Sequence, residues 1–77
     1  MMNKYTFSCT DLNLDDPGIN IEFREKFPKA TVTTLPIFVG TTFIHVESDE
    51  PQDQFIRDVT YDLCTLDASN ISLVGVS

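Results

Sequence analysis

Residues 49–66 read DEPQDQFIRDVTYDLCTL, and the fold can be worked out from this stretch. At 100° per residue, its apolar side chains share one face about 100° wide: Phe55, Ile56, Val59, Leu63 and Leu66. Asp49 is placed to cap the first turn, Gln52 completes a capping box, and a first-turn proline is tolerated. The stretch therefore predicts an amphipathic helix of about four turns from Glu50 to Leu66.

Segments on both sides of this helix have the patterns of strands. Four segments are predicted to be strands, because they are rich in β-branched or aromatic residues or alternate between apolar and polar side chains. They are Lys4–Thr10, Thr31–Val39, Thr41–Glu47 and Ile71–Val76. In the first, the aromatic and thiol side chains are expected to face the core and the hydroxyl side chains to face outward. Gly40 separates the middle two as a hairpin turn. Pro36 has no amide proton and predicts an edge strand or a bulge.

The segment Ile19–Phe27 fits two structures. Its apolar residues recur every four positions, as on one face of a helix, but its first half also alternates as a strand would. We favour a short helix, because most of its residues are adequate helix formers and Pro28 ends it. Before it, Asp16–Gly18 reads Asp-Pro-Gly, which predicts a type II turn.

The expected order is strand, helix, strand, strand, helix, strand within a single α+β domain spanning residues 1–77. This order resembles the ferredoxin-like βαββαβ arrangement, a four-stranded antiparallel sheet with both helices on one face. The resemblance rests on element order alone, so it implies no function. If Ile19–Phe27 were a strand, the fold would be a five-stranded sheet with one helix.

The chain is small and acidic, with 77 residues and a formal net charge of −7. Seven of its 12 acidic residues follow Val46, where Arg57 is the single base, so this part carries −6. So acidic a chain is expected to repel nucleic acid.

The start of the sequence lacks a secretory pattern, and no apolar run is long enough to cross a membrane. Two distant cysteines indicate free thiols, and we expect a cytoplasmic protein, in the host cytoplasm if it is viral.

Residues that could carry chemistry are few. His45 has no nucleophile and orienting group at recognisable spacing, so we expect no catalytic site and no enzyme. The acids of 47–53 lack the spacing of a calcium loop and are explained by a helix N-terminus, so no metal is expected. The chain also lacks a glycine-rich phosphate loop, and we expect no cofactor.

The outer face of the predicted helix is the best candidate site. We expect a partner to bind five of its side chains: Gln54, Asp58, Tyr61, Asp62 and Thr65. Asp58 and Asp62 lie four residues apart, and Asp62 also lies near the helix C-terminus, where the dipole disfavours anions. A tyrosine among carboxylates has the composition of a partner-facing patch, although a solvated face would also contain these residues.

These patterns favour a non-enzymatic domain that docks its acidic helix face on a basic surface of a larger protein. Chains of this size and charge are common among phage and mobile-element products, so the protein is expected to act as an anti-defence inhibitor or DNA mimic. The alternative is a structural homo-oligomer, at its simplest a homodimer, that pairs through sheet edges. That alternative rests on the hairpin of 31–46, where only Pro36 interrupts an uncharged edge.

Overall fold

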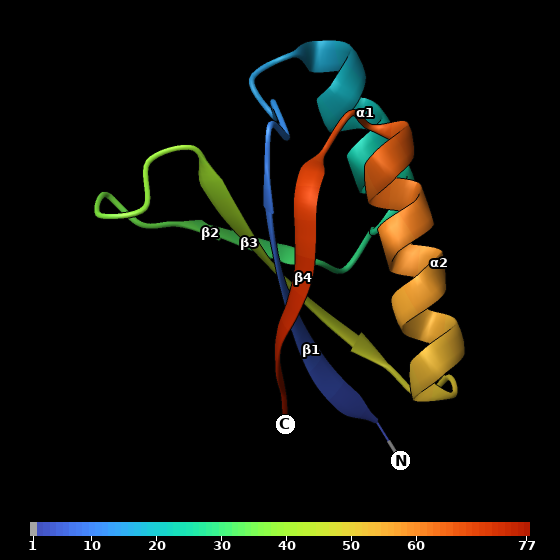
Figure 1. Cartoon of the computed structure of the whole chain (residues 1–77). Coiled ribbons are helices and arrows are strands. Elements are labelled where there is room, and N and C mark those ends of the chain that lie inside the picture. The colour runs from blue at the N-terminus through green and yellow to red at the C-terminus, as the bar shows by residue number, and fades with distance from the viewer. Residues whose placement is uncertain (1) are drawn as a thin grey trace.

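The computed structural model describes residues 2–77, and its elements follow the predicted order. They are β1 (Asn3–Thr10), α1 (Pro17–Lys26), β2 (Thr31–Thr34), β3 (Thr41–Ser48), α2 (Gln52–Thr65) and β4 (Ser69–Val76). Figure 1 shows both helices on one side of the sheet, whose other side is uncovered. The segment Ile19–Phe27 is therefore helical, and the five-stranded alternative is wrong.

The four strands form one antiparallel sheet in the order β2-β3-β1-β4. The register sets Phe7 opposite Ile44 and Tyr5 opposite Val46 on the face that carries the helices. Because side chains alternate along a strand, Thr6 and His45 then lie opposite one another on the uncovered face. This arrangement is ferredoxin-like, as the sequence predicts, and β2 is an edge strand, as Pro36 indicates.

The core lies between the sheet and the two helices. Its largest fully buried side chains come from β1, β3, α1, α2 and the turn after α2: Tyr5, Phe7, Phe23, Ile44, Val59, Leu63 and Leu66. The rings of Tyr5 and Phe55 lie 4.8 Å apart between their centroids, which joins β1 to the start of α2. The apolar face predicted for α2 is thus the buried one, with Ile56 at its margin.

Helix α1 begins two residues earlier than predicted. Asp16 is its N-cap, and the carboxylate Oδ1 accepts hydrogen bonds from the N–H groups of Gly18 at 2.9 Å and Ile19 at 3.3 Å. The predicted type II turn at Asp-Pro-Gly is wrong, because Pro17 and Gly18 form the first turn of the helix. Proline suits this position, since its fixed φ is helical and its missing N–H would have had no partner.

The Asp16 cap predicts a measurable loss of stability in a variant. Asp16→Ala removes the acceptor of two amide groups and should lower the free energy of unfolding by about 1 kcal/mol. Urea denaturation followed by circular dichroism measures the change, and Asp16→Asn should restore most of it. Asp15→Ala is the control, because only the backbone N–H of Asp15 is hydrogen-bonded, to Asn13. Equal losses in the alanine variants would show that capping is not the cause.

Helix α2 begins two residues later than predicted, and the predicted Asp49 cap is wrong. Its N-cap is Pro51, with no side-chain hydrogen bond to the first turn. Ser48 Oγ instead accepts the backbone N–H of Glu50 at 3.1 Å, before the helix starts. The physical reason is Pro51, since a proline disfavours helical geometry in the residue before it. The helix ends at Thr65, one residue before the predicted Leu66.

The predicted strand Thr31–Val39 is only half as long in the structure. Strand β2 stops at Thr34, and residues 35–40 form the hairpin connection. Two turn hydrogen bonds close it, from Phe38 N–H to Leu35 O and from Thr41 N–H to Phe38 O, each 3.0 Å long. Gly40 adopts a φ of 83°, which glycine permits without strain. The connection projects beyond the sheet on the side away from the helices (Figure 1).

Candidate interaction surfaces

The outer face of α2 presents four of the five predicted site residues to solvent. Gln54, Asp58 and Thr65 are exposed, and 70% of Tyr61 is accessible. Their spacing of three and four residues places them along one side of the helix, opposite the buried face. Thr65 Oγ1 donates a hydrogen bond to the backbone oxygen of Asp62 at 2.6 Å, so this hydroxyl is directed into the last turn. The exposed group at the centre of this acidic face is the phenol of Tyr61.

Asp62, the fifth predicted residue, lies at the margin of the acidic face. Its carboxylate pairs with Lys26 Nζ at 3.8 Å, and both side chains are about one-third exposed. The negative charge of Asp62 near the C-terminal end of α2, which the helix dipole disfavours, is thus compensated by Lys26 at the end of α1. No spacing in the sequence indicates Lys26 as the partner of Asp62, because pairing between two helices depends on how they pack. Asp62 therefore contributes to helix packing as well as to the charge of this surface.

A groove runs beside the acidic face, where the end of α1 meets α2. Its volume is about 370 Å³. Lys26 and Lys29 lie along one wall, while Glu50, Asp58 and Asp62 lie along the other. The groove is therefore lined by side chains of both charges. The exposed side chains on the outer side of α2, away from the groove, are mostly acidic or neutral. A basic partner would be attracted most strongly to the outer side of α2, away from the two lysines.

The uncovered sheet face carries the only histidine. The Thr6 hydroxyl lies 3.1 Å from His45 Nδ1, and the Thr33 hydroxyl lies 3.2 Å from Nε2. Strand pairing brings these three residues together from β1, β2 and β3, which no sequence spacing indicates. Both ring nitrogens of His45 thus have threonine hydroxyls as partners. The two contacts link the imidazole of β3 to the strands on both of its sides.

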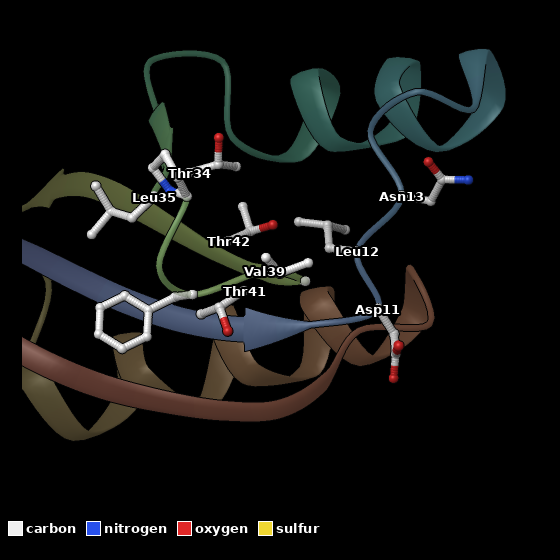
Figure 2. A pocket seen from close by; sticks show the side chains of 11 residues that line it. Asp11, Leu12, Asn13, Thr34, Leu35, Val39, Thr41 and Thr42 are labelled. Carbon is white, nitrogen blue, oxygen red and sulfur yellow. The ribbon is translucent and has the colours of Figure 1, made fainter.

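A second hollow lies at the end of the sheet, between the β1–α1 and β2–β3 connections (Figure 2). It has a volume of about 600 Å³. Leu12 and Val39 form apolar parts of its lining, and Thr41 and Thr42 add hydroxyl groups. Asp11 is its single carboxylate among the described residues.

The two thiols have opposite environments. Cys9 is buried in the core on β1, and burial raises its pKa from 9.0 to about 11. Cys64 is exposed near the end of α2.

Within residues 2–77, no group of three or more His, Cys, Asp or Glu side chains is arranged to hold a metal ion. None of the helices in this part of the chain has the length and apolar content to span a membrane.

Comparison of the chain with protein-family models, with curated protein sequences and with solved structures gave no match. Any statement about function therefore has to be argued from the surfaces described above.

Proposed function

We propose that this protein is a non-enzymatic binding domain whose acidic α2 face docks on a basic surface of a larger protein. The observation that carries the proposal is Tyr61, a large aromatic side chain that is 70% exposed and lies one helical turn from the exposed Asp58 and Arg57. Tyrosine is enriched among residues that dominate binding energy, because it adds apolar area and a hydroxyl at low entropic cost.

Charge supports the same surface. Helix α2 carries Asp53, Asp58 and Asp62 against Arg57, and it has no basic residue in its last turn. The acidic groups add to the negative end of the helix dipole, which strengthens the negative potential at the C-terminal half of the helix. Such a potential accelerates encounter with a positively charged partner. A nucleic-acid-binding protein is a partner of this kind, and occupying its basic surface would inhibit it.

The test is a pair of substitutions on the acidic face. In affinity capture from a cell lysate, Tyr61→Ala should reduce retention of the bound protein by about 30-fold, the effect of losing a dominant interface residue. Asp58→Lys should also reduce retention. Raising the salt concentration to about 0.5 M should release the wild-type complex, because screening weakens exposed charge pairs. Quantitative mass spectrometry of the retained protein measures each effect.

Asp15→Lys is the matched control for this experiment. It changes the net charge by the same amount as Asp58→Lys, but it lies in the exposed connection before α1. Asp62 is left unchanged, because its replacement by lysine would oppose Lys26 and disturb helix packing. Equal retention of the Asp58→Lys and Asp15→Lys variants would show that net charge alone governs binding. Retention that survives Tyr61→Ala and high salt would contradict the proposal.

A further inference from the structure

The connection between β2 and β3 exposes a cluster of apolar side chains. Within residues 35–40, the exposed fraction is 81% for Ile37 and 91% for Val39, and Leu35 and Phe38 are also exposed. Single apolar residues on a surface are normal, but four within six residues are not. They lie at the tip of a hairpin, and none of them belongs to the hydrophobic core of the chain.

This apolar tip is continuous with the uncovered face of the sheet. The ring of Phe38 meets the ring of Phe43 edge-on, with 6.1 Å between centroids and 70° between planes. Phe43 lies opposite Ser8 on β1 and Thr33 on β2, so it belongs to the uncovered face. We call the uncovered sheet face together with residues 35–40 the neutral surface.

The neutral surface differs from the rest of the molecule in charge. The strand register places only two charged side chains of the described residues on it, Lys4 and Glu47, which face each other at 3.8 Å. Otherwise it presents hydroxyl, aromatic and aliphatic groups, with Val74 of β4 exposed at the far side. The excess negative charge lies instead on the helices and connections.

We infer that the occupant of the neutral surface is a second copy of this chain, packed face to face in a symmetric dimer. Two chains of −7 repel each other, and repulsion is smallest when the face on which Lys4 and Glu47 balance each other is in contact. A charged partner would gain no electrostatic attraction on this surface. Two sheets can pack face to face through interdigitating side chains, and a two-fold axis makes one surface serve both chains.

The dimensions of the molecule limit such a dimer to an interface of about standard size. The principal dimensions of the molecule are 33 × 27 × 19 Å, and a sandwich of one sheet and one helix layer is thinnest across its layers. The neutral surface therefore extends over at most about 900 Å², compared with about 800 Å² per partner in a stable interface of standard size. Pairing along the β2 edge offers less area, because β2 has only four residues.

The test compares two identical substitutions at exposed isoleucines. Ile37→Asp on the neutral surface should weaken dimerisation by about 100-fold, because each dimer loses two apolar side chains from its interface. Ile21→Asp is the matched control, since Ile21 is 59% exposed on α1 and outside the neutral surface. Sedimentation equilibrium measures the mass against 8.7 kDa for one chain. Thr33→Glu, at an exposed position of β2, should weaken dimerisation without touching the hairpin tip.

The effect of salt concentration distinguishes this dimer from the docking proposed for α2. Dimerisation through the neutral surface should strengthen as salt rises, because repulsion between the chains is screened, whereas docking of the acidic face should weaken. A wild-type chain that remains at 8.7 kDa up to about 1 mM would overturn the dimer, since stable interfaces of this size assemble far below that concentration. Equal weakening by Ile37→Asp and Ile21→Asp would also overturn it. A monomer that binds phosphatidylcholine vesicles through Ile37 would assign the apolar tip to a bilayer instead.

Discussion

Leu63→Ala is expected to lower the free energy of unfolding by about 3–4 kcal/mol. Leu63 is fully buried at the centre of the helix face that packs on the sheet. Its truncation loses apolar transfer energy and leaves a cavity that the surrounding rings of this small core cannot fill completely. A chain of 77 residues is expected to have about 4–12 kcal/mol of total stability, so the variant loses a large share of it.

Urea denaturation monitored by circular dichroism measures this loss as a lower midpoint with an unchanged slope. Tyr61→Ala is the control on the same helix, and it should change the free energy of unfolding by no more than about 0.5 kcal/mol because the ring is exposed. Similar losses in both variants would mean that α2 does not bury the face containing Leu63. The same control shows that lost binding in Tyr61→Ala does not come from unfolding.

The two thiols should differ in reactivity by about 1,000-fold or more in the native protein. Cys64 is exposed and should react with a disulfide reagent at pH 8 at the rate of an ordinary thiol. Cys9 is buried, and burial raises its pKa to about 11, so it stays protonated and shielded until the fold opens. The release of the coloured thiolate of the reagent should therefore show one fast and one slow phase of equal size.

Variants assign the two phases and connect them to stability. Cys64→Ser should remove the fast phase and leave the slow one. In that background, Leu63→Ala should accelerate the slow phase by about 150- to 800-fold, because the open state becomes more populated by the free energy that the truncation removes. Two fast phases in the wild-type chain would contradict the burial of Cys9. A slow phase unaffected by Leu63→Ala would show that Cys9 is reached by a local opening that leaves α2 in place.

Most of the fold could be predicted because its elements have strong local patterns. The alternation of 4–10 and the apolar face of 49–66 each follow from the geometry of one element, and both were correct. The errors concern element ends. Pro17 and Gly18 start α1 because Asp16 caps them, and Pro51 delays α2 because it restricts the residue before it. In each case one proline was assigned the wrong local role.

The candidate surfaces could be predicted less completely, because they depend on contacts between distant residues. The exposure of Tyr61 follows from helix geometry, and the sequence indicates it. The pairing of Asp62 with Lys26, and the contacts of His45 with Thr6 and Thr33, require helices and strands to be packed in one particular way. The exposed tip at 35–40 was not predicted, because this apolar run was interpreted as the second half of an edge strand.

The sequence by itself determined the order of the elements, the buried face of α2 and the concentration of acidic charge after Val46. These properties depend on the spacing of neighbouring residues, which is present in the chain before it folds. The element order also indicated that both helices cover one face of the sheet, but only the tertiary structure decided that the other face has almost no charge and continues into the exposed tip at 35–40. That separation results from strand register and helix packing, which join residues far apart in the sequence, and it is the basis for proposing two distinct interaction surfaces.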